Sequence, residues 1–111
     1  MDFNEYQKEC TKTLINKYDT KVMLLMYLSL GLASESGEYT NKAKKILRDD
    51  NAKISEEKKE ALLDELGDVL WYASQIASTL DTDFESLAKN NIKKLHSRLE
   101  RGKISGSGDN R

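Results

Sequence analysis

Four acidic residues form two pairs with matched spacing. Glu35 and Glu38 are three residues apart, and Glu65 and Asp68 repeat this spacing after 26 intervening residues. Residues three apart share one face of a helix, so each pair would present two carboxylates together. Four acids without matching cations repel each other, and a hard divalent cation removes that repulsion. The spacing therefore predicts a metal site built from these four carboxylates.

Two glycines distinguish these pairs from ordinary solvated acids, which also occur three or four residues apart on surface helices. Gly37 lies inside the first pair and Gly67 inside the second. Glycine within a helix costs about 1 kcal/mol relative to alanine, so its presence needs a reason. We expect both glycines to permit the close backbone approach that a crowded metal cluster requires.

A second group of polar residues recurs at helical spacing near the C-terminal end. Asn91, Lys94 and Arg98 are three and four residues apart, so one helix face would offer an amide and two cations. Such a face suits polyphosphate oxygens, and a solvated basic face is the alternative. Lys42 and Lys45 follow the first acidic pair, either as further phosphate contacts or as counter-charges to the acids.

The elements that must position these residues are helices. Proline is absent, and helix-favouring residues dominate between short breaks, which predicts an all-α fold. Apolar periodicity places four helices at about residues 3–17, 20–48, 55–79 and 82–101. The predicted N-caps are Asp2, either Asp19 or Thr20, Ser55, and Thr82 with Glu85 completing a capping box.

The second of these helices is unusually apolar at its start. Residues 22–33 are apolar nearly all the way round, yet a bilayer requires about 20 such residues. A helix buried on all sides needs more covering than three neighbouring helices of this size supply. The segment therefore predicts a subunit interface, and a central core helix in a monomer is the alternative.

Length and charge narrow the class of protein. The 111 residues suffice for one domain, which we place at residues 1–101, followed by a flexible Gly/Ser-rich tail at 102–111. The net charge of −1 provides no basic field, so DNA binding is not expected. One cysteine and no targeting or membrane-spanning segment favour a cytoplasmic protein without membrane attachment.

Taken together, these residues resemble the MazG-type nucleotide pyrophosphohydrolases of the all-α NTP pyrophosphatase superfamily. The resemblance runs from about Tyr6 to Arg101. The family signature is E-x-x-E, a spacer of a dozen to nearly thirty residues, and E-x-x-D, which the two acidic pairs match. The flanking segments that also match are Gly31–Leu32, Gly67–Tyr72 and Asn91–Leu95 together with Arg98.

The resemblance implies a four-helix, bundle-like fold and a reaction. Water would attack the α-phosphorus of an NTP or dNTP and release the monophosphate and pyrophosphate, as in nucleotide-pool house-cleaning. Mg²⁺, or Mn²⁺ in its place, would be bound by the four acids, which would also be the catalytic residues. By resemblance Lys94 and Arg98 would bind the triphosphate, with Asn91 nearby. Lys42, by its position, and Trp71 are further candidate substrate-binding residues. For Trp71 and Tyr72, packing in the core is the favoured alternative to contact with the base or sugar.

The resemblance also implies a homo-oligomer, either a dimer or a dimer of dimers, with active sites bordered by more than one subunit. Ala33-Ser34 stands where many relatives have another acid, which leaves the number of metal ions open. The tail either stays disordered or folds over a bound nucleotide. The alternatives for function are a non-catalytic helical interaction module and, within the superfamily, a phosphoribosyl-ATP pyrophosphohydrolase. A di-iron bundle fails because it needs two E-x-x-H motifs, and His96 is the one histidine.

Overall fold

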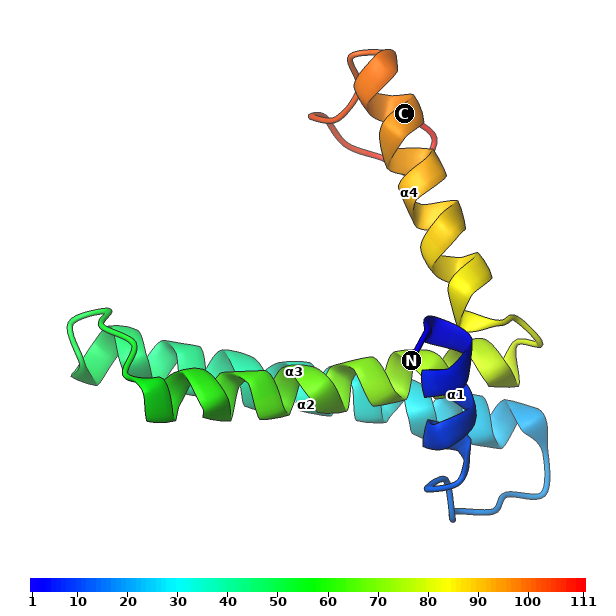
Figure 1. Ribbon diagram of the computed structural model, residues 1–111, viewed down its shortest axis with the longest axis horizontal. Helices are drawn as coiled ribbons and strands as arrows, with labels where there is room; N and C mark the ends of the chain where they lie inside the picture. The colour runs from blue at the N-terminus through cyan, green and yellow to red at the C-terminus, as the bar shows by residue number, and fades with distance from the viewer.

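The computed structural model describes residues 1–111 and contains four helices and no strands, which confirms the all-α prediction. The helices are α1 (Phe3–Thr11), α2 (Lys21–Asp49), α3 (Glu56–Thr79) and α4 (Phe84–Glu100). Helices α2 and α3 lie side by side as a long antiparallel hairpin (Figure 1). Helix α1 crosses the hairpin near one end, and α4 leaves that same end and points away from it. None of the helices is sufficiently long and apolar to cross a membrane.

Side chains at the predicted positions cap three of the helices. Asp2 forms the capping box of α1 with Glu5, Thr20 accepts from the Met23 N–H, and Ser55 accepts from the Lys58 N–H. The predicted cap of α4 is wrong by one residue. Asp83, not Thr82, accepts from the Ser86 N–H, and the Thr82 carbonyl instead accepts a hydrogen bond from Gln7.

Helix α1 is shorter than predicted, because it ends at Thr11 and not near residue 17. The Thr13 hydroxyl accepts a hydrogen bond of 2.7 Å from the Trp71 indole N–H on α3. The same hydroxyl donates to the Cys10 carbonyl, which also accepts from the Thr13 backbone N–H in a tight turn. A β-branched residue fixed in this way favours departure from the helix, and the chain then turns toward α2.

Polar residues form much of the buried core where α1, α3 and the start of α4 meet, whereas Leu28 and Ile46 are buried on α2. Gln75 is 1% exposed and Ser74 is completely buried. The Gln7 amide donates to the carbonyls of Ser74 and Thr82, and its oxygen accepts from the Phe84 N–H at 2.9 Å. One side chain of α1 thus ties the end of α3 to the beginning of α4. We refer to this region as the joint.

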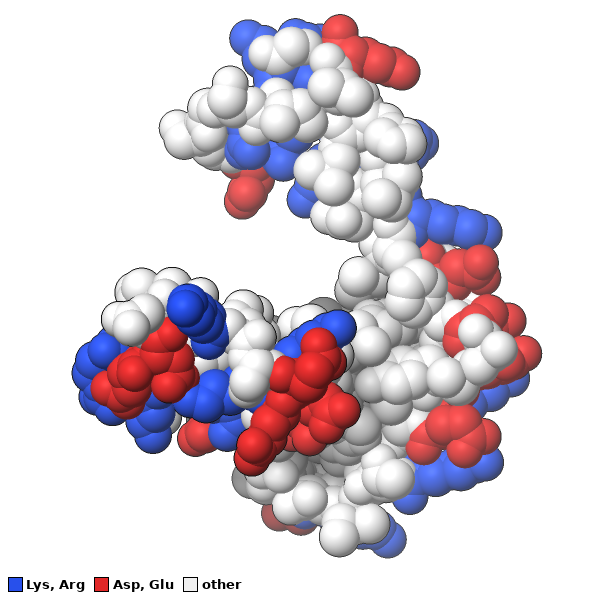
Figure 2. Space-filling view, turned by 60° about the vertical axis from the view of Figure 1, so that its left-hand side comes forward, with Lys and Arg blue, Asp and Glu red and all other residues white.

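Outside the joint the chain is open. Its radius of gyration is 16.9 Å, against about 13 Å for a compact domain of this length. No Cα atom of α4 lies within 8 Å of one in α2, so the four helices do not close into a bundle within one chain. Figure 2 shows a largely uncharged surface along α4, beside the gap that separates α4 from the hairpin of α2 and α3.

Many apolar side chains on these surfaces remain exposed. The apolar face of α4 is buried only at its start, because no other helix covers the rest. Exposed residues of this kind on α2, α3 and α4 include Met26, Leu30, Leu63, Leu66, Leu70, Leu87, Ile92, Leu95 and Leu99.

Candidate active site

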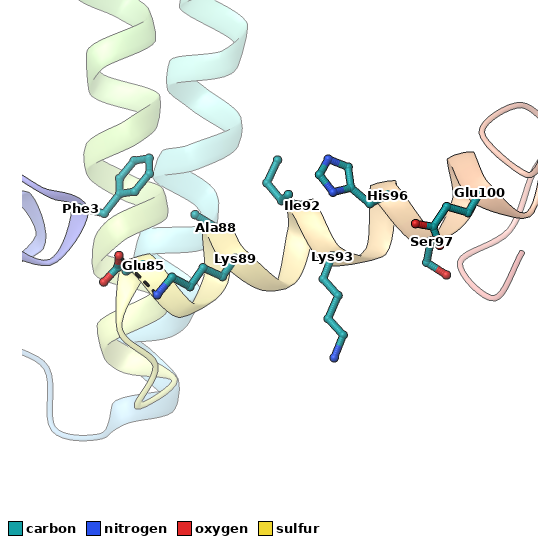
Figure 3. A pocket seen from close by; sticks show the side chains of 9 residues that line it. All are labelled: Phe3, Glu85, Ala88, Lys89, Ile92, Lys93, His96, Ser97 and Glu100. Carbon is teal, nitrogen blue, oxygen red and sulfur yellow. Dashed lines mark ion pairs between the residues drawn. The ribbon is translucent and has the colours of Figure 1, made fainter.

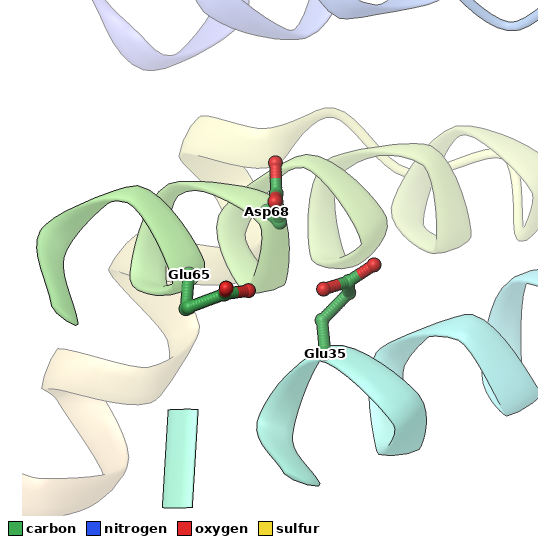
Figure 4. A group of neighbouring side chains, drawn as sticks. All are labelled: Glu35, Glu65 and Asp68. Atoms are coloured by element: carbon green, nitrogen blue, oxygen red, sulfur yellow. The ribbon is translucent and has the colours of Figure 1, made fainter. Parts of the chain in front are cut away.

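Three of the four predicted acids meet between α2 and α3. One carboxylate oxygen from each of Glu35, Glu65 and Asp68 lies within 4.8 Å of the other two. Figure 4 shows Glu35 reaching across from α2 toward the two acids of α3. Glu35 and Glu65 are half-buried, whereas Asp68 is exposed. Oxygen donors gathered from two helices at this spacing fit a hard divalent cation.

The electrostatics of this cluster agree with crowding of like charges. Burial raises the pKa of Glu35, and the nearby charges of Asp68 and Glu65 raise it further. A hydrogen bond with the Glu65 carboxyl adds to this effect. Glu38 lies outside the group and is exposed, although its charge also raises the pKa of Glu35. The structure therefore brings together three predicted ligands and places the fourth one helical turn away.

Lysines line the groove between α2 and α3 beyond the acids. The Lys42 ammonium lies 3.1 Å from a carboxylate oxygen of Glu65. A cavity between α2 and α3 is lined by Lys42, Lys45 and Lys58, with Ile46 and Ala61. Lys58, which also forms an ion pair with Asp50, had no role in the sequence analysis. Its position on α3 becomes significant only once the hairpin places it opposite Lys45.

Aromatic residues lie on the other side of the acids. The Tyr72 ring covers Gly31, where an added Cβ would lie 2.1 Å from a ring carbon. Burial raises the pKa of Tyr72, as do its hydrogen bond with Tyr27 and the charge of Glu35. Trp71 meets Tyr72 edge to face, with ring centroids 4.9 Å apart. Both rings are half-buried against the protein, and a contact of Trp71 with a base stays a prediction.

The expected role of two glycines is wrong. No atom lies within 4 Å of a Cβ built at Gly37 or Gly67, so neither glycine permits close packing within this chain. Close packing occurs instead at Gly31, which has no room for a side chain beneath Tyr72.

Helix α1 brings one further hydroxyl group toward the acids. Burial, together with a hydrogen bond to Cys10, raises the pKa of Tyr6 to about 12, and the charge of Asp68 contributes. From the sequence alone, Tyr6 only marked the start of the family resemblance. Its proximity to Asp68 depends on how α1 crosses the hairpin, which no local pattern encodes.

The polar face of α4 does not meet the acids within one chain. Asn91 and Lys94 line a groove with Leu70 and Phe84, on the side of α4 toward the joint. Arg98 is buried beneath residues 102–111. No ion pair or hydrogen bond connects these three residues with the acidic cluster.

Another hollow lies along α4 beside α1, away from the acids (Figure 3). It contains a single ion pair, between Lys89 and Glu85 at 3.6 Å. Its polar groups do not converge on one point, so we assign the chemistry to the acidic cluster. The residues that line the hollow are Phe3, Glu85, Ala88, Lys89, Ile92, Lys93, His96, Ser97 and Glu100.

A known family matches most of the chain. The model of the MazG nucleotide pyrophosphohydrolase domain matches residues 26–102, which is most of the chain. The chain belongs to the MazG family. The MazG match contains both acidic pairs and the polar face of α4, whereas α1 and residues 103–111 lie outside it.

One relative aligns over more residues than the domain match covers. The Gene 37 protein of Mycobacterium phage L5 is 49% identical over 87 residues, which cover 78% of this chain and 76% of that protein. No solved structure matches the chain.

Proposed function

We propose that this MazG protein hydrolyses nucleoside triphosphates, either NTPs or dNTPs, to the monophosphate and pyrophosphate. The observation that carries the proposal is the convergence of Glu35, Glu65 and Asp68 between two helices of a MazG domain. Such a cluster is unfavourable without a cation, and a polyphosphate substrate brings further negative charge that a cation would neutralise.

Mg²⁺, with Mn²⁺ as a substitute, is the cofactor that suits these oxygen donors. Glu35, Glu65 and Asp68 would hold it, and Glu38, one turn further along α2, is the proposed fourth ligand. Bound there, the metal would lower the pKa of a water molecule and neutralise phosphate charge. The chain's own contribution is to place acids from two helices on one side of the reacting phosphate.

The groove between α2 and α3 suggests a direction for the substrate. Lys42 and Lys45 would bind the departing pyrophosphate on one side of the acids, where cations stabilise developing negative charge. The aromatic side chains around Tyr72 and Trp71 lie on the other side, where the nucleoside would be placed. Lys42 lies beside Glu65, so metal binding to that carboxylate would leave the Lys42 ammonium free for phosphate.

Asn91, Lys94 and Arg98 would complete the site from a second copy of the chain. Within one chain, α4 lies away from α2, and the apolar faces of both helices are uncovered. A dimer or a dimer of dimers would bury these faces and bring a polar α4 face to the acids of another subunit. The same exposed faces are compatible with a non-catalytic interaction module, which remains the alternative of another class.

The test is a panel of NTPs, dNTPs and phosphoribosyl-ATP incubated with Mg²⁺, with release of pyrophosphate as the measurement. We expect EDTA to abolish turnover and added Mg²⁺ to restore it. Asp68→Asn and Glu38→Gln should each lower kcat by about 100-fold or more.

The matched control is Asp64→Asn, which removes an exposed acid from the same helix outside the cluster. It should retain the wild-type rate. Absence of pyrophosphate release from every compound would contradict the enzymatic proposal and favour the interaction module. Hydrolysis of phosphoribosyl-ATP alone would replace the proposed substrate class with that compound.

A further inference from the structure

Residues 102–111 fold back on the end of α4, where three arginines hold them. Arg98 donates to the Asp109 carbonyl at 3.0 Å, and Arg101 donates to the backbone oxygen of Arg111. The Arg111 guanidinium in turn donates to three carbonyls of its own segment, those of Lys103, Ile104 and Gly108. The segment is therefore closed into a loop by its own side chain.

These hydrogen bonds leave the backbone N–H groups of the loop without acceptors in the chain. Every contact made by the three arginines to the loop uses a backbone oxygen. In contrast, no backbone N–H from Ile104 to Arg111 donates to an acceptor within the chain. The φ angles of Gly106 and Gly108 are +107° and +91°, in a backbone region that suits glycine. Backbone turns with successive free N–H groups form concave anion-binding sites.

Arg98 is a second, independent indication that this loop binds an anion. Its side chain is only 6% exposed, yet it forms no ion pair, and its one hydrogen bond to the loop goes to a neutral carbonyl. A buried cation without an anionic partner is unfavourable. A guanidinium group binds phosphate through two parallel hydrogen bonds, which satisfy both its charge and its geometry. Arg98 lies on the helix face that also carries Asn91 and Lys94.

We propose that residues 103–111 form a phosphate strap, a loop that binds the pyrophosphate part of the nucleotide through its backbone N–H groups. Arg98 holds the strap against α4 and would bind the same phosphate. Gly102, with a φ of +66°, allows the chain to reverse at the end of the helix. The inference rests on the proposed function for the identity of its ligand, a polyphosphate.

Inorganic tripolyphosphate, titrated calorimetrically into the full chain in EDTA, tests the strap apart from the acidic cluster, which needs a metal to accept an anion. Arg111→Lys keeps the charge, but one ammonium cannot bridge three carbonyls in the same geometry. We expect this variant to bind tripolyphosphate about tenfold more weakly than wild type. Arg48→Lys is the matched control, because it makes the same exchange at an exposed arginine that pairs with Asp49 on α2, outside the strap, and the affinity should not change.

Limited trypsin digestion gives a second measurement of binding, which can be made on the wild-type chain. Tripolyphosphate should protect the Lys103–Ile104 bond in the wild-type chain, and protection should be weaker in Arg111→Lys. Wild-type affinity in Arg111→Lys would overturn the strap, because charge alone would then explain binding. Tighter binding by a chain shortened to residues 1–102 would also overturn it, because the loop would then compete with phosphate.

The two proposals fail in different ways. Pyrophosphate release by a wild-type chain whose tripolyphosphate affinity is unaffected by Arg111→Lys would refute the strap alone. Weakened tripolyphosphate binding in Arg111→Lys, in a chain that hydrolyses no nucleotide, would refute the proposed activity and retain the anion site.

Discussion

The joint and the middle of the hairpin are packed in opposite ways, although α3 runs through both. At the joint, Gln7, Ser74 and Gln75 are buried, and no buried polar side-chain atom lacks a hydrogen-bond partner. In the middle of the hairpin, the acids adjoin exposed leucines such as Leu63 and Leu66. The buried contacts at the joint therefore fix the directions of α1 and α4. The surfaces to which we assign the proposed chemistry remain open, as binding of a metal, a nucleotide and a second subunit would require.

The largest expected effect comes from placing a charge on the open surface. Met26 on α2 is 50% exposed in the single chain, and the proposed interface would bury it. In Met26→Asp, burial of an unpaired carboxylate should cost about 3 kcal/mol and weaken self-association by about 100-fold. Size-exclusion chromatography with light scattering at micromolar concentration should change from oligomer to monomer.

Ile15→Asp is the control for this substitution. Ile15 is 81% exposed and lies between α1 and α2, away from the proposed interface. The Ile15→Asp variant should remain an oligomer at the same concentration. A wild-type monomer, or equal behaviour of the two variants, would show that the open surface is not an interface between copies.

The joint should respond to loss of hydrogen bonds and not to loss of an apolar surface. Gln7→Leu retains a similar volume but leaves the Phe84 N–H and the carbonyls of Ser74 and Thr82 without their partner. We expect the free energy of unfolding to fall by about 3 kcal/mol, measured by urea denaturation at fixed protein concentration. Lys8→Leu, at the exposed neighbouring position, should change it by less than about 0.5 kcal/mol. A small effect at Gln7 would mean that the joint does not depend on this network.

The sequence predicted the parts of the molecule that local rules determine. Helical periodicity and the capping side chains of Asp2, Thr20 and Ser55 located three helix starts. The spacing of the acids predicted which helix faces would carry them, and three of the four converge. These features depend on contacts between residues three or four apart, which a single sequence displays directly.

The remaining features depend on contacts between distant residues. Helix α1 ends early because Trp71, 58 residues away, bonds to Thr13. The start of α4 moves by one residue because Gln7 uses the backbone of Thr82. Lys58 joins the site because it faces the lysines of α2 across the hairpin. Periodicity gives the face of each helix, but it does not determine which partner covers that face.

Two glycines on α2 offer a smaller and sharper comparison. At Gly31 an added methyl group would collide with the Tyr72 ring at 2.1 Å, whereas Gly37 has open space around it. Gly31→Ala should lower the free energy of unfolding by about 2 kcal/mol through overpacking. Gly37→Ala should raise it by about 1 kcal/mol through higher helix propensity.

Thermal or urea denaturation of the two glycine variants measures this difference. If Gly31→Ala is as stable as Gly37→Ala, the contact between Gly31 and Tyr72 is not a close one in solution. The double substitution Gly31→Ala with Tyr72→Leu should recover part of the lost stability, because the colliding ring atoms are removed.

The smallest expected effect concerns the cap of α4 and its dependence on pH. Hydrogen bonds from the Ser86 backbone N–H and hydroxyl lower the pKa of Asp83 from its ordinary 3.8. A group whose pKa is lower in the folded state stabilises that state above its unfolded pKa and loses this contribution as the pH falls through the folded value. Asp83→Asn keeps an N-cap acceptor but cannot titrate. The stability of wild type relative to Asp83→Asn should therefore be greatest near pH 6 and decline below pH 3.8.

Urea denaturation of both proteins across this pH range isolates Asp83, because the other titrating groups are common to the pair and cancel in the difference. Repeating the pair in a Ser86→Ala background should shrink the pH-dependent difference, since one of the two hydrogen bonds from Ser86 that lower the pKa is gone. A difference that does not change between pH 6 and pH 3 would mean that Ser86 does not hold the Asp83 carboxylate in solution. The start of α4 would then depend on Gln7 at the joint and not on its cap.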